Sequence, residues 1–377
     1  LRRILKDQER AKRGGGSATG VVKSTRPDVK LPEVPVSEHM MKDFAKFDQN
    51  KVAFRDLEGD REITFAELQG SVKKCGAGLA SSGFKQGECL LVFSPNHVDY
   101  ASCYAGVAAI GGICSTANPA YTARELAHQL HDSTAVYVVT LSALLPVVRE
   151  AMAVHPGQVR KVFTFDAAGA DAGDVTQFSE LLNNNGKAFP KNVKIDPKND
   201  VVGLPYSSGT TGLSKGVMLT HHNLTSNLEQ VSSVFQVKKE DNLLAVLPFY
   251  HIYAQTLLLI GGPMNGATVN VMSKFDPALF LKTIQAHKIT ILHIVPPIVL
   301  FLAKHPLVDQ FDLSSVHTIV CGAAPLGEEL ASAVVKRLKL TNLLQGYGMT
   351  ELSPVTHISP QGNKKYGAAG ILVANTE

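Results

Sequence analysis

The sequence predicts an α/β protein built from two subdomains of the αβαβα type, each with a mostly parallel β-sheet. Short apolar runs alternate with longer amphipathic segments along most of the chain, which is the pattern of repeated βαβ units. The alternation is interrupted by a hydroxyl- and glycine-rich stretch, residues 204–224, and then resumes. Because 377 residues exceed what one compact core usually holds, we expect two α/β halves, about 37–195 and 196–377.

The composition is that of a soluble globular protein, with 45% hydrophobic and 19% charged residues. The net charge of +4 is too small to indicate binding to nucleic acid or to an acidic membrane surface. No apolar run is long enough to predict a membrane span. The five cysteines form no C-x-x-C pair, and their odd number and apolar neighbours indicate reduced, mostly buried thiols in an intracellular compartment.

Residues 1–30 are predicted to be a basic, flexible extension that precedes the folded domain, residues 31–377. Arginines and lysines dominate the start of the chain and are followed by Gly14-Gly-Gly-Ser. A transit peptide is the alternative, but Asp7 and Glu9 favour a disordered tail because transit peptides are poor in acidic residues. The chain begins with Leu1 and stops at Glu377 without a recognisable ending, so we expect it to be a fragment.

Helices and strands alternate through the first half. Thr64 and Thr122 each precede a glutamate by three residues, Glu67 and Glu125, which is the capping-box signature of a helix start. Two short strands are expected to pair around the turn at 58–60. The expected helices cover 39–46, 64–79, 98–110, a segment from 122, and 141–154, and the expected strands cover 52–55, 62–65, 90–93, 112–116, 135–140 and 161–165.

The second half repeats the alternation after an apolar strand at 201–204. Because ligands gather at the carboxyl ends of parallel strands, the segments that follow the strands are the candidates for a binding site. The expected helices cover 222–235, 254–261, 277–287, 297–303 and 327–338, and the expected strands cover 243–247, 268–272, 290–295, 317–321 and 343–344.

A loop that suits a polyphosphate follows the strand at 201–204. Glycines let the backbone approach an anion closely, and consecutive N–H groups form a concavity that binds it. A Walker-type loop does not fit, because Ser214 and Gly216 stand where that motif has Gly and Ser or Thr. A Ser/Gly-rich surface turn is the alternative. The candidate phosphate ligands are Ser207, Ser208, Gly209, Thr210, Thr211, Gly212 and Lys215.

The segment Ser207-Ser-Gly-Thr-Thr-Gly-Leu-Ser-Lys-Gly216 resembles the phosphate-binding motif of the adenylate-forming enzymes. That family includes acyl-CoA synthetases, 4-coumarate–CoA ligases, beetle luciferases and nonribosomal peptide adenylation domains. It usually has proline where this chain has Ser214, so the loop is expected to be slightly looser here. The resemblance covers about residues 37–377. Residues 276–313 are most similar to coumarate ligases, luciferases and medium- or long-chain acyl-CoA synthetases.

A histidine follows the strand at 243–247, in Leu247-Pro-Phe-Tyr-His-Ile-Tyr253. A lone histidine at a strand end is more often structural than catalytic, but this segment resembles the family's Pro-x-x-His motif. The resemblance implies that His251 orients the carboxylate that attacks ATP, where two anions approach and need a donor between them. It also implies that Tyr253 contacts the acyl adenylate and that Lys274 contacts CoA. An ordinary surface lysine is the alternative for Lys274.

Small residues follow the strand at 317–321 and make room for a ligand against bare backbone. The segment Cys321-Gly322-Ala323-Ala-Pro-Leu resembles a family segment that usually has glycine at the position of Ala323. The resemblance implies that Gly322 and Ala323 line the acyl pocket, and the extra methyl group is expected to narrow this pocket or to shift the ligand. The alternative is a helix entry with Pro325 near its first turn.

The last segment with site chemistry is Leu344-Gln-Gly-Tyr-Gly-Met-Thr-Glu351. Tyr347 can stack on a purine, Thr350 can donate to the α-phosphate, and Glu351 can hold Mg²⁺, which prefers oxygen ligands shared with substrate phosphates. A glycine-rich turn is the alternative, but a turn does not require Met-Thr-Glu. By resemblance, Gln345, Gly346, Tyr347 and Thr350 belong to the ATP/AMP site, Gly346 and Met349 to the acyl site, and His251, Lys215 and Thr350 are catalytic.

These motifs predict the large domain of an acid–thiol ligase similar to 4-coumarate–CoA ligases and acyl-CoA synthetases. With ATP, Mg²⁺ and CoA it would convert a carboxylic acid, either hydroxycinnamate-like or a fatty acid, into acyl-AMP and then a thioester. Two alternatives stay open: a luciferase-like adenylating oxygenase, and a truncated module that binds nucleotide or acyl-AMP with little turnover.

The resemblance also sets expectations about what the chain lacks. The family continues beyond the position of Glu377 with a small C-terminal lid domain that carries the adenylation lysine. This fragment is therefore expected to bind ATP and acyl-adenylate but to form acyl-AMP slowly. The expected location is cytoplasmic or peroxisomal, since a peroxisomal signal would sit at a C-terminus outside the chain.

Overall fold

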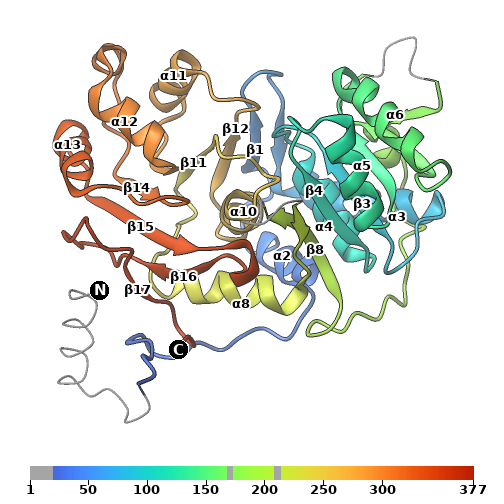
Figure 1. Ribbon diagram of the computed structural model, residues 1–377, viewed down its shortest axis with the longest axis horizontal. Coiled ribbons are helices and arrows are strands. Elements are labelled where there is room, and N and C mark those ends of the chain that lie inside the picture. Colours follow the sequence, from blue (N-terminus) through green and yellow to red (C-terminus); the bar gives the residue numbers. More distant parts are fainter. Residues whose placement is uncertain (1–19, 168–172, 208–213) are drawn as a thin grey trace.

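The computed structural model describes residues 20–167, 173–207 and 214–377, and it contains two β-sheets covered by helices (Figure 1). Residues 1–19 of the predicted basic extension and Ser208–Gly212 of the predicted phosphate loop lie outside the described residues. No helix among the described residues combines the length and the apolar character that crossing a lipid bilayer requires.

The first sheet has eight strands and is parallel through its centre. Two of its strands, formed by residues that flank the predicted phosphate loop, run antiparallel to their neighbour. The order is β10 (Leu219–Thr220), β8 (Val201–Ser207), β4 (Ile113–Ala117), β3 (Cys89–Phe93), β5 (Ala135–Thr140), β6 (Lys161–Thr164) and β7 (Val175–Gln177), with β9 (Lys215–Gly216) paired to β8.

The second sheet has nine strands, and its central pairs are also parallel. Antiparallel pairs occur at its two edges. The order is β17 (Ile371–Leu372), β16 (Val355–Ile358), β15 (Asn342–Gly348), β14 (Thr318–Cys321), β13 (Ile291–Ile294), β11 (Asn242–Ala245), β12 (Thr268–Val271), β1 (Val52–Asp56) and β2 (Glu62–Thr64). The predicted α/β class with mostly parallel sheets is confirmed.

The sheets exchange strands across the middle of the chain, so a division at residue 196 does not follow them. β1 comes from the first half but pairs in parallel with β12, where Phe54 lies opposite Val269. β8 comes from the second half but pairs in parallel with β4, where Pro205 lies opposite Thr116. Chain order alone does not show this exchange, because strand pairing is decided by packing between segments far apart in the sequence.

The helices begin largely where the sequence predicts. Both predicted capping boxes are present, since the N–H of Glu67 donates to Thr64 Oγ1 (3.2 Å) and the N–H of Glu125 donates to Thr122 Oγ1 (3.4 Å). The helices are α2 (Val36–Phe44), α3 (Phe65–Ser81), α4 (Tyr100–Ala109), α5 (Ala123–Asp132), α6 (Leu145–Val154), α7 (Phe178–Leu182), α8 (His221–Ser232), α9 (Ile252–Ala254), α10 (Gly261–Met264), α11 (Pro277–His287), α12 (Pro296–Lys304) and α13 (Glu328–Leu338), with 3₁₀ segments η1 (Ser142–Leu144), η3 (Pro306–Gln310) and η4 (Thr350–Leu352).

The helix expected at 254–261 differs from a regular α-helix. A π-helical segment, η2 (Gln255–Ile260), joins α9 to α10. Gln255 is buried in this segment, and its Nε2 donates to Thr116 Oγ1 of β4 over 3.4 Å. A π turn holds an extra residue, so it shifts the side chains around the helix axis, and such turns are frequent at functional sites.

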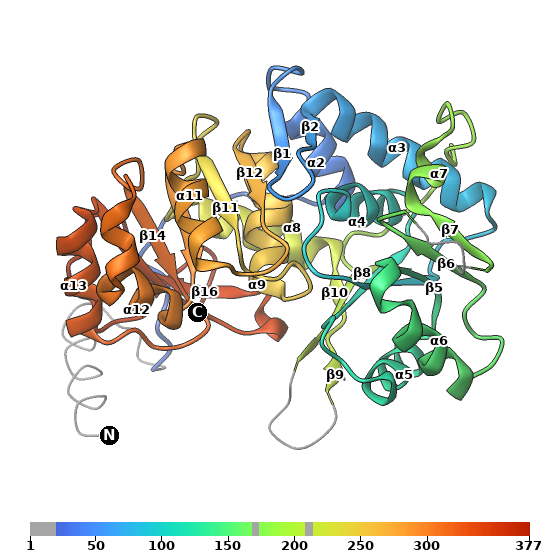
Figure 2. The ribbon, with the colours of Figure 1, turned by 90° about the horizontal axis from the view of Figure 1, so that it is seen from above.

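The hydrophobic core has three parts that follow the layers. The largest lies between the sheets and contains residues of both, such as Val92 of the first sheet and Val269 of the second. A second part packs under α11, α12 and α13, and a third under α5 and α6. Figures 1 and 2 show these outer helices at opposite ends of the molecule, with α2, α4 and α8 between the sheets. All five cysteines are free and buried, as predicted.

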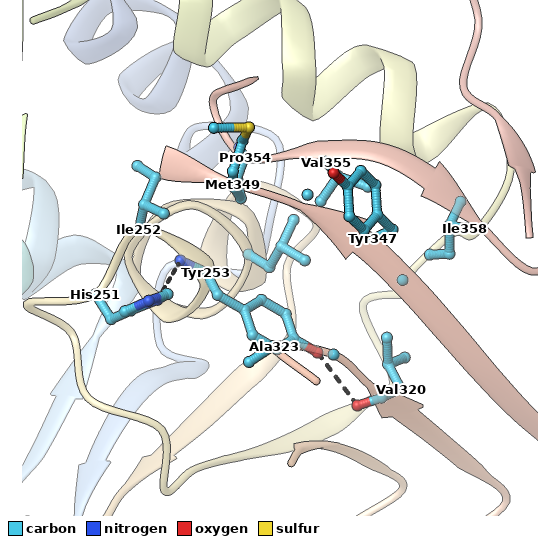
Figure 3. Close-up of a pocket in the computed structure, with 14 residues that line it drawn as sticks. His251, Ile252, Tyr253, Val320, Ala323, Tyr347, Met349, Pro354, Val355 and Ile358 are labelled. Atoms are coloured by element: carbon cyan, nitrogen blue, oxygen red, sulfur yellow. Dashed lines mark hydrogen bonds between the residues drawn. The ribbon is translucent and has the colours of Figure 1, made fainter. Parts of the chain in front are cut away.

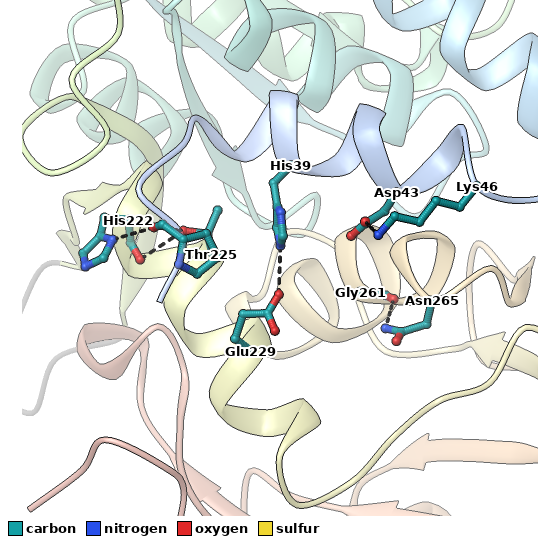
Figure 4. A network of polar contacts seen from close by, with 9 residues as sticks. His39, Asp43, Lys46, His222, Thr225, Glu229, Gly261 and Asn265 are labelled. Carbon is teal, nitrogen blue, oxygen red and sulfur yellow. Dashed lines mark hydrogen bonds and ion pairs between the residues drawn. The ribbon is translucent and has the colours of Figure 1, made fainter. Parts of the chain in front are cut away.

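Polar contacts attach α2 to α8 within the central layer (Figure 4). His39 Nε2 lies 3.1 Å from Glu229 Oε1, and His222 Nδ1 lies 2.9 Å from the carbonyl oxygen of Pro32, just before α2. In the same layer, Asn265 Nδ2 donates to the carbonyl of Gly261 over 2.7 Å. These contacts tie the entry segment of the fold to the helix that follows the predicted phosphate loop.

Candidate active site

His251 lies in the loop between β11 and α9 and caps the N-terminus of α9. The N–H of Tyr253 donates to His251 Nδ1 over 3.3 Å, so the proton of the neutral ring sits on Nε2. The residue reaches the surface, but the protein around its imidazole partly removes the ring from water. This desolvation lowers the pKa of His251 below its ordinary value. At neutral pH His251 therefore presents an N–H donor, which suits a carboxylate.

Asn96 holds the His251 loop from the end of the neighbouring sheet. Its side chain is buried, and Oδ1 accepts from the N–H of Phe249 over 2.7 Å. Its Nδ2 lies within donor distance of the carbonyl oxygens of Ala245 (3.2 Å), Leu247 (2.9 Å) and Met272 (3.2 Å). The loop is fixed again where Thr116 Oγ1 donates to the carbonyl of Tyr250 over 2.9 Å. Asn96 and Thr116 are thus positioning residues for His251.

An apolar pocket opens beside His251, with about 490 Å³ of empty space that is partly open to solvent (Figure 3). The Tyr253 hydroxyl, 3.2 Å from the carbonyl oxygen of Val320, donates to it across the pocket wall. Such a size and lining are typical of a site for a small organic ligand. The lining residues are His251, Ile252, Tyr253, Leu257, Val320, Gly322, Ala323, Gly346, Tyr347, Gly348, Met349, Pro354, Val355 and Ile358.

The predicted small residues line this pocket, and their geometry explains their size. A Cβ at Gly322 would lie 3.2 Å from the ring of Tyr253, so a side chain there would crowd the tyrosine. Ala323 has φ +67°, in the left-handed region that favours glycine. The departure from the family's usual glycine therefore strains the backbone as well as adding a methyl group to the pocket.

β15 carries the other wall of the pocket and leads into η4. Tyr347 is 53% exposed and packs edge-on against His357, with ring centroids 5.7 Å apart, so one face of the phenol stays available for stacking. Met349 is also exposed, and Thr350 is buried. A Cβ at Gly348 would lie 1.9 Å from the carbonyl oxygen of Pro354, so only glycine fits there.

Gln345 is used differently from the other residues of the β15 segment. Its Oε1 accepts from the N–H of Leu326 over 3.1 Å, and its Nε2 donates to the carbonyl oxygens of Leu326 and Tyr366. The side chain is buried and does not line the pocket. The amide of Gln345 therefore supports β15 against the segment before α13, and its backbone N–H and carbonyl oxygen are paired with the hydroxyl and the N–H of Ser359.

The ends of the predicted phosphate loop meet the end of the β15 segment. Ser207 lies opposite Lys215 in the pairing of β8 with β9, and both residues flank the part of the loop outside the described residues. Ser207 Oγ donates to Glu351 Oε1 over 3.3 Å, which joins the first sheet to η4. Lys215 and Glu351 are exposed. The fold thus brings together a hydroxyl, a cation and a carboxylate from two motifs far apart in the sequence.

Lys274 is not part of this cluster. It is exposed in the turn after β12 and is not one of the residues that line the pocket. Within the described ranges, no group of three or more His, Cys, Asp or Glu residues could hold a metal ion. A metal at Glu351 would therefore need further ligands, which phosphates of a bound substrate can supply.

Sequence reasoning missed several residues of the site. Asn96, Leu257, His293 and Ile358 lie in or next to apolar runs that read as core. His293, for example, sits in Ile291-Leu-His-Ile, where the strand pattern gives no sign that its side chain meets the phenol of Tyr253. The sequence offered one signal. Asn96 is a polar residue just after β3, and ligands gather at the carboxyl ends of such strands.

Comparison with known proteins identifies the class. A family model described as AMP-binding enzyme matches residues 41–377, so the chain belongs to the AMP-binding enzyme family. Among curated proteins, it is 40% identical over 368 residues to a probable 4-coumarate–CoA ligase of Dictyostelium discoideum, which covers 93% of this chain and 66% of that protein. The chain thus spans about 66% of the length of that relative.

Solved structures show the same fold. A long-chain-fatty-acid–CoA ligase from Archaeoglobus fulgidus superposes with a TM-score of 0.83 at 26% identity, covering 94% of this chain and 71% of that one. A natural red emitting luciferase from Phrixothrix hirtus superposes with a TM-score of 0.80 at 24% identity, covering 93% of this chain and 75% of that one. The predicted architecture, that of the large domain of adenylate-forming enzymes, is confirmed.

Proposed function

We propose that this site binds ATP and a carboxylic acid and joins them as an acyl-adenylate, and that the complete protein passes the acyl group to CoA. The observation that carries the proposal is that an apolar pocket and a polar cluster lie along the same strand. An apolar pocket begins at His251 and continues along β15, and the same strand leads to Glu351, which contacts Ser207. The pocket suits the acyl group, and the cluster suits the phosphates.

The proposed reaction needs no proton transfer in its first step. A carboxylate oxygen attacks the α-phosphorus of ATP, the bond from that phosphorus to the bridging oxygen breaks, and pyrophosphate leaves. The Nε2–H of His251 would hold the carboxylate, while Lys215 and the hydroxyl of Thr350 would face the charge that develops on the phosphate. Removal of one well-placed donor of this kind typically costs about 10²–10³-fold in rate.

Glu351 fits a Mg²⁺ ion that would accompany the nucleotide. It is an exposed carboxylate beside Ser207, and Mg²⁺ is commonly held by one or two carboxylates together with substrate phosphates. When bound, Mg²⁺ would neutralise phosphate charge. Tyr347 would stack on the adenine, and Gly322, Ala323, Gly346 and Met349 would line the acyl group.

The second step would release AMP when the CoA sulfur attacks the acyl carbonyl carbon and the thiol proton passes to solvent. Lys274 would contact CoA from its exposed turn. The similarity to a probable 4-coumarate–CoA ligase and to a fatty-acid–CoA ligase supports an aromatic or fatty acid as the substrate. The likeness to a luciferase, at 24% identity, is one of fold.

The test is calorimetric titration of the chain with an acyl-sulfamoyl adenosine, a stable mimic of acyl-AMP, with hydroxycinnamoyl and fatty acyl versions. We expect saturable binding that weakens by roughly 5- to 150-fold when Tyr347 is replaced by Ala, since stacking of a base on an aromatic side chain contributes about 1–3 kcal/mol by alanine substitution. Tyr366→Ala is the matched control, because Tyr366 lies outside the pocket lining. Absence of binding by every version would contradict the proposed function.

A further inference from the structure

A second, smaller pocket adjoins the one beside His251. The two share the side chains of Leu257 and Ile358, so they are separated by parts of the same wall. The second pocket has about 400 Å³ of empty space, partly open to solvent, and is mostly apolar. Its lining residues are Leu228, Val231, Ser232, Phe235, Val237, Leu257, Gly261, Asn265, His293 and Ile358.

His293 connects the two pockets through Tyr253. It lies on β13, is only 2% exposed, and its Nδ1 is 3.3 Å from the Tyr253 hydroxyl oxygen. Tyr253 lines the first pocket and His293 lines the second, and their rings meet edge to face with centroids 5.8 Å apart. An acid whose carboxylate is held at His251 would pass Tyr253 before its far end reaches His293.

The hydrogen bonds around Tyr253 fix the tautomer of His293. The Tyr253 hydroxyl has one hydrogen and donates it to the carbonyl oxygen of Val320, 3.2 Å away. Its oxygen can therefore only accept from His293, which places the imidazole proton on Nδ1. Nε2 is left as an acceptor, and it is buried with no hydrogen-bond partner among the described residues.

An unpaired acceptor in an apolar wall is costly unless something supplies a hydrogen. Burial lowers the pKa of His293 to about 4, so the ring stays neutral at physiological pH and Nε2 keeps its lone pair. His221 also has a buried, unpaired Nε2, but it lines neither pocket. An unpaired nitrogen is therefore not a ligand site by itself. At His293 it coincides with a pocket that adjoins the proposed acid site and shares Leu257 and Ile358 with it.

We propose that His293 is a specificity residue that selects carboxylic acids bearing a hydroxyl group at the end remote from the carboxylate. The acid would extend past Tyr253, and its hydroxyl would donate to His293 Nε2. The inference rests on the proposed function, since it assumes that the acid is activated at His251. The hydroxyl can belong to an aromatic ring or to an alkyl chain, and the experiment separates these sources.

The test measures acid-dependent ATP–pyrophosphate exchange by the protein expressed from its complete reading frame. Two matched pairs of acids differ only in the remote hydroxyl: 4-hydroxycinnamate against cinnamate, and 10-hydroxydecanoate against decanoate. In the unsubstituted protein, kcat/KM should favour the hydroxylated member of at least one pair by roughly 5- to 100-fold, the range expected when a buried acceptor gains or lacks its donor. The pair that shows the preference identifies the source of the hydroxyl.

Variants assign the preference to one side chain. His293→Phe keeps a ring but removes the acceptor, so the preference should fall to about one while activity on the unhydroxylated acid is kept or rises. His293→Gln retains an acceptor and should restore part of the preference; it also serves if His293→Phe does not fold. His221→Phe is the matched control, because it removes a buried imidazole that lines neither pocket, and the preference should survive.

Three results would overturn the inference. The unsubstituted protein could show no preference in either pair, as expected if the second pocket holds only water. The preference could be unchanged in both His293 variants, or lost equally in His221→Phe. Exchange with none of the four acids would instead count against activation of these acids at His251, and would remove the basis of the inference with it.

Discussion

The loop that carries His251 should depend on Asn96 for its stability. Asn96→Ala leaves the buried N–H of Phe249 without its 2.7 Å acceptor and deprives the carbonyl oxygens of Ala245, Leu247 and Met272 of a donor. A buried donor left unsatisfied costs about 1–3 kcal/mol, and each further hydrogen bond contributes about 0.5–1.5 kcal/mol. Because the two amide hydrogens are shared among three carbonyls, we expect a total loss of about 2–4 kcal/mol in the free energy of unfolding.

Urea unfolding at neutral pH measures this loss. Asn199→Ala is the matched control, because Asn199 is exposed and its amide donates to Asp196 Oδ2 at the surface over 2.7 Å; its effect should stay below about 1 kcal/mol. A positioning role adds a second expectation: in the active protein, Asn96→Ala should raise KM for the acid under conditions in which the variant is folded. Equal unfolding energies for the two variants would refute the argument that Asn96 holds the loop.

Three further predictions follow from the site and its surroundings. Ala323→Gly should raise the free energy of unfolding by about 0.5–1 kcal/mol in urea, because relief of the left-handed backbone outweighs the entropy cost of glycine; a loss of stability would show that φ +67° carries no strain. Burial lowers the pKa of His221 and His293 to about 4 in the folded protein, against about 6.5 in the unfolded chain. The unfolded state therefore binds more protons between these values, and stability should fall as pH falls from 6.5 to 4, by up to about 3 kcal/mol for each histidine. Urea unfolding at a series of pH values should show this slope and a smaller one for His293→Gln, and a flat profile would contradict the burial of both rings. Glu351→Gln should shift the Mg²⁺ dependence of ATP binding to higher concentrations, whereas Glu240→Gln, an exposed control, should not; superimposable titrations would make Glu351 an ordinary loop residue.

Local signals made much of the fold predictable. The capping boxes at Thr64 and Thr122 placed two helix starts, and the strand Ala135–Thr140 and the helix Pro277–His287 have the predicted bounds. These segments have strong periodicity and clear ends. The pairing of β1 with β12 and of β8 with β4 could not be read in the same way, because contacts between residues far apart in the chain decide which sheet a short strand joins.

The residues of the candidate site were also predictable where a local motif marks them, and not where distant contacts define their role. Residues in distinctive motifs, such as His251, Tyr253 and Gly322, line one pocket together. Asn96 and His293 were missed, because their roles come from hydrogen bonds to Phe249 and Tyr253, which lie far away in the sequence. The binding and catalytic roles predicted for all of these residues, and for Ser208–Gly212 and Lys274, remain predictions that binding experiments must test.

The most direct test of the central claim follows an oxygen atom. The complete protein is incubated with ATP, Mg²⁺, CoA and an acid, either 4-hydroxycinnamate or a fatty acid, whose carboxylate carries ¹⁸O, and the products are examined by mass spectrometry. Attack of the carboxylate on the α-phosphorus, followed by thioester formation, transfers one labelled oxygen to AMP. We therefore predict AMP with a single ¹⁸O and unlabelled pyrophosphate. Acid-dependent consumption of ATP that leaves AMP unlabelled, or that places the label in inorganic phosphate, would contradict the claim that this site forms an acyl-adenylate.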